Sequence, residues 1–242
     1  MTGSETGTLD ARLLSVYSFI RHGSTAVDVG SDHARLVCAL VEDGVCPFAS
    51  ATDINFLPLE NARAEILRRG LQSKIKTYLC DGLAQVPPNS ADDIIIAGMG
   101  GELICKIISG ASWLCDKNKR LALQPMTKAD RLRTFLYQSG FEILKERASQ
   151  TDGRLYTALS VAYTGKKRTI TPVFAKIGML PLDPSPEASA YIREQAHVAQ
   201  KISLGLALSS SDTDKLQSLW FKKLSDDLIS IANGGDYCDF RP

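Results

Sequence analysis

Two spacings of apolar residues alternate along the first two thirds of the chain. Short runs rich in Val, Ile, Leu and Ala are typical of buried strands. The segments between them repeat apolar residues every three or four positions, as amphipathic helices do. The predicted strands are 26–29, 48–52, 75–80, 93–97, 120–123, 141–147 and 155–163, and the predicted helices are 9–20, 34–41, 59–69, 102–108 and 128–137.

This alternation predicts the fold class. Strands that alternate with helices form parallel sheets covered on both faces, so we expect an α/β fold with a doubly wound, mostly parallel sheet. The last two predicted strands are separated only by a turn at Thr151-Asp152-Gly153. Such a hairpin would place one antiparallel strand at or near the edge of the sheet.

The pattern changes after Thr164. A basic segment, 165–168, precedes a proline-punctuated stretch and two further helical patterns, which predict an antiparallel helical hairpin. The stripe positions are Ile192, Ala196, Ala199, Ser203 and Leu206 in the first helix and Leu216, Leu219, Leu224, Leu228 and Ile231 in the second. We therefore expect two independently packed units, 1–164 and 165–242, with the sheet complete in the first.

The composition narrows the class of protein. The 242 residues carry a formal net charge of +1, which produces no global field for a nucleic-acid partner but leaves room for a local basic face. Residues 1–8 are small and polar, unlike a signal peptide, and we find no apolar run long enough to span a bilayer. We therefore expect no membrane association. The six cysteines form no Cys-x-x-Cys pair and have no His cluster beside them. This pattern predicts reduced thiols in a cytoplasmic protein and no metal site.

Two glycine turns carry the candidate chemistry. Gly30 follows the first predicted strand, and Gly98-Met99-Gly100-Gly101 follows the fourth. In both places we expect a strand, a sharp turn and the start of a helix. Glycine lets the backbone approach a ligand closely, and a helix start presents free N–H groups. Two such turns predict one ligand lying across the carboxyl ends of neighbouring strands.

Three acids, Asp28, Asp53 and Asp81, lie at or near the ends of three successive predicted strands. Carboxylates there can accept hydrogen bonds from ribose hydroxyls or from an adenine amino group. Singly, such acids are more often helix caps and turn formers. Together with the two glycine turns they favour a nucleoside ligand. Since the Gly-x-Gly-x-x-Gly fingerprint is missing and acids would repel a pyrophosphate, S-adenosylmethionine suits the site better than a dinucleotide.

Two other functions remain open on these residues. One is an NAD(P)-binding oxidoreductase with a Rossmann fold, against which the missing glycine fingerprint argues. The other is a non-catalytic RNA-binding protein with a remnant cofactor pocket. The intact set of Asp28, Gly30, Asp53, Asp81 and Gly98 argues against the second.

Motifs spread over residues 9–163 carry a family resemblance. They are Leu9-Asp-Ala-Arg12-Leu, Asp28-Val-Gly-Ser-Asp-His-Ala34, Thr52-Asp53-Ile54 with Pro58-Leu59, Asp81-Gly82-Leu83, Ile96-Ala-Gly-Met-Gly-Gly101, Leu123-Gln124-Pro125 with Leu132-Arg133, and Arg154-Leu155-Tyr156. This set resembles a bacterial family of tRNA methyltransferases that methylate N1 of adenine at position 22 of tRNA. The sequence departs from the family pattern at Met126, where a polar residue such as Asn is usual, and at Arg35, where an aromatic is usual.

The resemblance implies a class I (Rossmann-like) methyltransferase fold with a coiled-coil-like C-terminal domain, S-adenosylmethionine as cofactor and tRNA as partner. We expect the helical hairpin to serve tRNA binding. The predicted cofactor contacts are Asp28, Gly30, Asp32, His33, Asp53, Ile54, Asp81, Gly82, Gly98 and Met99; Gly98 and Met99 are also assigned to positioning the substrate base. The predicted tRNA contacts are Arg12, Lys128, Arg131 and Arg133. His33 is expected in the first turn of a helix.

Overall fold

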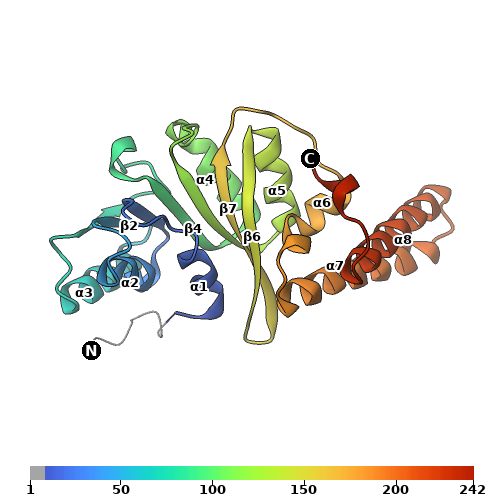
Figure 1. The fold of residues 1–242 in the computed structure, drawn as a ribbon, viewed down its shortest axis with the longest axis horizontal. Coiled ribbons are helices and arrows are strands. Elements are labelled where there is room, and N and C mark those ends of the chain that lie inside the picture. Colours follow the sequence, from blue (N-terminus) through green and yellow to red (C-terminus); the bar gives the residue numbers. More distant parts are fainter. Residues whose placement is uncertain (1–8) are drawn as a thin grey trace.

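A seven-stranded sheet forms the centre of the computed structural model, which describes residues 9–242 (Figure 1). Its strands follow the order β3-β2-β1-β4-β5-β7-β6, and β1 to β5 are parallel. The strands are β1 (Ala26–Val29), β2 (Ala49–Asp53), β3 (Ile75–Leu79), β4 (Asp93–Gly100), β5 (Arg120–Thr127), β6 (Phe141–Thr151) and β7 (Arg154–Tyr163). The predicted doubly wound, mostly parallel sheet is confirmed.

Helices cover both faces of this sheet, because successive strand residues point to opposite sides. Ala26 and Ile95 face the helices α1, α2 and α3, whereas Val27, Ile94 and Ile96 face the remaining helices. The helices are α1 (Ala11–Tyr17), α2 (Arg35–Glu42), α3 (Phe56–Arg68), α4 (Gly101–Gly110), α5 (Ala129–Gln138), α6 (Pro172–Ile177), α7 (Pro186–Ala207) and α8 (Asp212–Ala232). No helix within residues 9–242 is both long and apolar enough to cross a membrane.

The antiparallel strand is β7, which pairs with β5 on one side and with the edge strand β6 on the other. The predicted hairpin turn joins β6 to β7. Asp152 and Gly153 occupy its two central positions with φ of 49° and 73°. Positive φ at both positions matches the right-handed twist of the strands, and Asp-Gly is a favoured pair there.

Strands β4 and β5 run further than their apolar runs predict. β4 continues to Gly100 and β5 to Thr127, because their ends pair with each other through Met99 and Pro125. The register shifts on both sides of Met99, so the second glycine turn is a bulged strand end from which α4 begins directly at Gly101. The expectation of a separate turn between strand and helix was wrong here.

The C-terminal hairpin is formed by α7 and α8, which extend away from the sheet (Figure 1). The contact surface between the two helices, here called the seam, is less apolar than predicted. Leu224, Leu228 and Ile231 are buried as predicted, but Leu216 and Leu219 are 70% and 64% exposed, and Ser203 and Ser218 are buried instead. Ser203 and Ser218 each donate a hydroxyl to the other's carbonyl at 2.8 Å. Short polar side chains that bond across the seam let the two backbones approach closely.

The hairpin and the sheet share one apolar core. Val173, Phe174 and Ile177 of α6 and Leu228 of α8 are buried in the same cluster as the β4 and β5 side chains. The Phe174 ring meets Tyr137 of α5 edge-on, with ring centroids 5.3 Å apart. The expected independent packing of the two units is therefore not what the structure shows, and the boundary at 164–165 stays a prediction about chain organisation.

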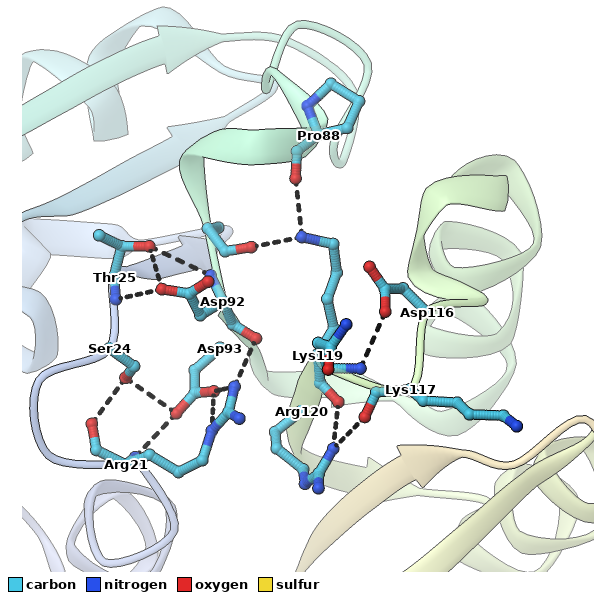
Figure 2. A network of polar contacts seen from close by, with 12 residues as sticks. Arg21, Ser24, Thr25, Pro88, Asp92, Asp93, Asp116, Lys117, Lys119 and Arg120 are labelled. Atoms are coloured by element: carbon cyan, nitrogen blue, oxygen red, sulfur yellow. Dashed lines mark hydrogen bonds and ion pairs between the residues drawn. The ribbon is translucent and has the colours of Figure 1, made fainter.

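An ion-pair network closes the amino edge of the sheet, opposite the glycine turns (Figure 2). Asp93, which is 1% exposed, accepts from the backbone N–H and the Nε of Arg21, both at 2.7 Å. Lys119 donates to the carbonyls of Pro88 and Ala91, also at 2.7 Å. These contacts pair Asp93 and Lys119 inside the fold and join the start of β4 to the segments before β1 and β5.

Candidate functional site

The strand register brings predicted site residues to one face at the carboxyl edge. Asp28 of β1 pairs with Ala51 of β2, and Asp53 lies two residues further along β2. Because side chains alternate along a strand, Asp28 and Asp53 lie on the same face. Gln124 of β5 reaches that face as well, since its partner Ala97 lies two residues beyond Ile95, the β4 partner of Asp28.

A cavity of about 590 Å³ opens at this edge between β1, β4 and α1. Sites of several hundred Å³ accommodate ligands of nucleoside size. Its lining residues are Asp10, Arg12, Leu13, Asp28, Gly30, Ser31, His33, Arg35, Leu36, Ala97, Gly98 and Met126. Four of the predicted cofactor contacts, Asp28, Gly30, His33 and Gly98, thus share one cavity.

Asp28 is the buried acid of this cavity. It is 7% exposed, and burial raises its pKa to about 7, although a 2.6 Å hydrogen bond from the Ser31 hydroxyl lowers the pKa in part. A carboxyl held with little solvation gains a great deal from a cationic group placed beside it. The site is therefore suited to a ligand with a positive charge at this point.

The first glycine turn is held against β2 by two backbone hydrogen bonds. The N–H groups of Gly30 and Ser31 both donate to the Thr52 carbonyl, at 2.8 and 3.0 Å. Gly30 has a φ of 71°, and a Cβ there would lie 2.2 Å from the terminal methyl of Met99. The left-handed φ is what favours glycine here, because the Met99 methyl is the end of a flexible side chain that could move aside.

His33 does not lie in the first turn of a helix as expected. It belongs to a 3₁₀ turn, Asp32–Ala34, and α2 begins afterwards at Arg35. His33 and Ala34 have φ of 66° and 50°, a left-handed conformation that costs free energy in residues other than glycine. Backbone strain of this kind concentrates at functional sites. The side chain of Asp32 lies outside what the structure describes.

A chain of polar contacts fixes the second glycine turn. Asp10 caps α1 and pairs with Arg12 at 3.1 Å. Arg12 Nη1 donates to Gln124 Oε1 at 2.9 Å, and the same oxygen accepts from the N–H of Gly98 at 3.0 Å. Since Gln124 is fully buried, these bonds hold Gly98, with its φ of 76°, in one place.

Met126 substitutes for a polar residue in this chain of contacts. Its sulfur lies 3.6 Å from Arg12 Nη1 and 3.8 Å from Gln124 Nε2, within reach of weak N–H···S bonds. A thioether is a weak acceptor, so the departure from the family pattern keeps an acceptor at this position.

The start of α4 packs directly on the segment between β5 and α5. A Cβ on Gly101 would lie 2.4 Å from the Lys128 carbonyl, so only glycine permits this approach. Lys128 has a φ of 57° where it precedes α5. The β4 and β5 ends therefore form one fixed rim beside the cavity.

Asp53, Ile54, Asp81 and Gly82, which are also predicted cofactor contacts, do not line this cavity. Asp53 is 8% exposed and accepts from the Asn55 N–H at 2.7 Å, and Ile54 beside it is 62% exposed. Asp81 and Gly82 line a separate hollow of about 220 Å³ with residues of α4. The structure therefore does not gather all three acids in one cavity, and the cofactor role of each stays a prediction.

The predicted tRNA contacts are distributed differently from expectation. Arg12 lines the cavity itself and is paired with Asp10, while Lys128 and Arg131 are exposed near the rim. Arg133 is fully buried, and its Nη2 pairs with Glu146 at 2.7 Å. The prediction that Arg133 contacts RNA was wrong, because the guanidinium is used inside the fold and no phosphate reaches it.

Gln124 is a buried residue of this site to which the sequence pattern assigns no role. Leu123-Gln124-Pro125 is one of the motifs of the family resemblance, but a glutamine after an apolar strand does not indicate which backbone group its side chain will bind. Within residues 9–242 there is also no group of three or more His, Cys, Asp or Glu side chains placed to hold a metal ion.

Comparisons with known proteins agree with this geometry. A methyltransferase domain family matches residues 9–159. The tRNA (adenine(22)-N(1))-methyltransferase of Bacillus subtilis (strain 168) is 33% identical over 172 residues, which cover 71% of this chain and 72% of that protein.

Solved structures match over most of the chain. The crystal structure of the B. subtilis m1A22 tRNA methyltransferase TrmK matches with a TM-score of 0.82 and 25% identity, covering 93% of this chain and 98% of that one. A Streptococcus pneumoniae protein assigned as a tRNA (m1A22) methyltransferase, in complex with S-adenosyl-L-methionine, matches with a TM-score of 0.79 and 30% identity, covering 91% and 99%. These matches include the helical hairpin as well as the sheet.

Proposed function

The chain belongs to the tRNA (adenine(22)-N(1))-methyltransferase family, and on this basis we propose that it transfers a methyl group from S-adenosylmethionine to N1 of adenine 22 in tRNA. The observation that carries the proposal is the cavity in which the buried Asp28 carboxyl and the Gly30 and Gly98 turns meet. A tRNA substrate also supports a cytoplasmic location.

The cavity residues fit S-adenosylmethionine. Asp28 offers an acid to its cationic amino-acid end, Gly30 lets the backbone approach, and the neighbouring Asp53 carboxylate suits ribose hydroxyls. No phosphate has to be accommodated among these acids. When bound, the cofactor supplies a methyl group on a positively charged sulfur, which is open to attack by a ring nitrogen.

The protein's part in the reaction is positioning. N1 of neutral adenine has an in-plane lone pair, so no side chain has to remove a proton before attack. The rim formed by Gly98 and Met99 holds the base in line with the methyl group, and its carbonyls accept from the adenine amino group. Gly100 carries no side chain there, which leaves room for a base taken out of its stack, whereas the space beside Gly101 is filled by the Lys128 carbonyl. Because Gln124 fixes Gly98, the rim is set before the base arrives.

The C-terminal part gives the tRNA a second surface in this proposal. A tRNA is far larger than the cavity, and phosphate contacts by a second unit would set its register without reading sequence. Residues 166–242 hold 10 basic and 9 acidic side chains, so any basic face depends on their arrangement. Exposed Lys128 and Arg131 remain proposed phosphate contacts at the rim.

We expect label from S-adenosylmethionine to enter unmodified bulk tRNA as 1-methyladenosine. The experiment is radiolabelled methyl transfer followed by nucleoside analysis of the product, with calorimetry of S-adenosylmethionine and NAD binding alongside. Label in a different nucleoside would overturn the assignment of N1 of adenine. Binding of NAD without binding of S-adenosylmethionine would overturn the methyltransferase assignment and favour a dinucleotide oxidoreductase.

Cofactor affinity should depend on pH through Asp28. The pKa of Asp28 is about 7 in the folded protein, above its value in the unfolded chain. The stability that protonated Asp28 gives the folded state without cofactor is therefore complete below about pH 4 and is lost as the pH rises through 7. Binding of a cationic group favours the charged form. We therefore expect the Kd for S-adenosylmethionine to rise by up to about tenfold per pH unit below 7.

Calorimetry between pH 5.5 and 8 tests this dependence, and proton release on binding should appear as a buffer-dependent heat. Ser31→Ala removes the hydrogen bond that lowers the Asp28 pKa, so the profile should shift to higher pH. Asp28→Asn should bind weakly with a flat profile. A flat wild-type profile would contradict a contact between Asp28 and the cationic end.

A further inference from the structure

A second cleft lies beside the cofactor cavity, on the other side of Met126. Met126 lines both hollows, so they adjoin at the end of β5. The cleft has a volume of about 390 Å³ and lies between the sheet and the first helix of the hairpin. Its walls come from the β5–α5 segment, from Leu155, Tyr156 and Thr157 of β7, and from Tyr191, Glu194 and Gln195 of α7.

The lining of this cleft is not that of a phosphate site. Lys176 pairs with Asp130 at 2.7 Å, so these two charges compensate each other. Lys128 and Glu194 are the other charged residues of the lining, and they too are opposite in sign. A site for an anion carries a surplus of positive charge or a set of free N–H groups, and this one has equal numbers of acids and bases.

The polar and aromatic side chains on the walls of this cleft suit the edge and the face of a nucleobase. Glu194 accepts from exocyclic amino groups, and Gln195 both donates and accepts, which matches the Watson–Crick edge of a base. Half-buried Tyr156 supplies an aromatic face for stacking. Buried Tyr191 and Thr157 close the floor, because the Tyr191 ring lies against the Arg133 guanidinium and Thr157 bonds to Glu146.

We infer that this cleft binds a second base of the substrate tRNA, a neighbour of the methylated adenine, stacked on Tyr156 with its edge toward Glu194 and Gln195. The inference rests on the proposed function. The target base enters at the β4 end, and RNA leaving it across β5 passes Met126 into the cleft. One wall belongs to the sheet and the other to α7, so the second base would be read jointly by both parts of the chain.

Steady-state methyl transfer to a tRNA transcript tests the inference. Tyr156→Ala should lower kcat/KM by about 5- to 150-fold, the range for loss of one stacked base, while Tyr156→Phe should stay near wild type. Gln195→Ala should also lower kcat/KM, and Gln200→Ala, an exposed position on the same helix, should not. The Kd for S-adenosylmethionine should be unchanged in all four variants.

A second experiment changes the tRNA instead of the protein and identifies which base occupies the cleft. Transcripts with an abasic site at each neighbour of the target adenine in turn should lose activity with the wild-type enzyme. For the neighbour that occupies the cleft, removing the base should cause little further loss of activity in Tyr156→Ala, because this variant has already lost the stacking contact. If Tyr156→Ala and Gln195→Ala methylate tRNA as wild type does, the inference is overturned and the proposed function stands. If the wild type methylates no tRNA, the proposed function itself has failed.

Discussion

Replacing Arg133 by alanine should lower the free energy of unfolding by about 3–5 kcal/mol, because it leaves a buried carboxylate without its partner. Arg133 and Glu146 are both fully buried; burial by itself lowers the pKa of Arg133, but the negative charge of Glu146 beside it raises that pKa above its ordinary value. Arg133 Nη1 also donates to the Ala175 and Lys176 carbonyls at 2.8 Å, at the end of α6. One substitution thus removes an ion pair and a helix cap together.

Urea denaturation measures the effect, with Arg131→Ala as the matched control. Arg131 lies on the same helix but is exposed, so its loss should change stability by no more than about 0.5 kcal/mol. The double variant Arg133→Met/Glu146→Gln should lose less than Arg133→Ala, since no unpaired charge stays buried. Equal unfolding curves for Arg133→Ala and Arg131→Ala would contradict the buried-pair account.

Arg133 also shows what a sequence pattern leaves open. A basic residue just after the fifth strand fits an RNA contact as well as an internal ion pair. The choice depends on Glu146 and on α6 carbonyls more than 40 residues away. The same limit applies to Leu216 and Leu219, which have helical spacing but are exposed, while Ser203 and Ser218 form the buried contact between the two helices. In both cases tertiary packing decides burial.

The carboxyl edge could be predicted because its geometry is local. Parallel strands end at one edge, so acids and glycines that follow apolar runs are brought near each other whatever the rest of the fold does. Asp28 and Gly98 line one cavity for that reason. Asp81 does not, because the segment after β3 turns toward α4, and the Thr52 hydroxyl on the other face donates to the Gly82 carbonyl at 2.9 Å.

Replacing Asp53 by alanine should weaken S-adenosylmethionine binding by about 2–4 kcal/mol, or about 30- to 1,000-fold in Kd, if this carboxylate holds two ribose hydroxyls. Asp53 ends β2 on the same face as Asp28 and is 8% exposed. Its position at a strand end means that the core stays intact, so the variant should fold. Isothermal calorimetry gives the Kd, and circular dichroism checks the fold.

The competing explanation is that Asp53 only shapes the loop by accepting from the Asn55 N–H. Asp53→Asn separates the two roles. The amide oxygen still accepts from Asn55, so a loop role predicts near-normal affinity. A ligand role predicts that affinity stays low, because the amide has lost the charge and one acceptor. Asp92→Ala, an acid at the opposite edge of the sheet, should leave the Kd unchanged. Wild-type affinity in Asp53→Asn, with weak binding in Asp53→Ala, would assign Asp53 to the loop rather than to the ribose.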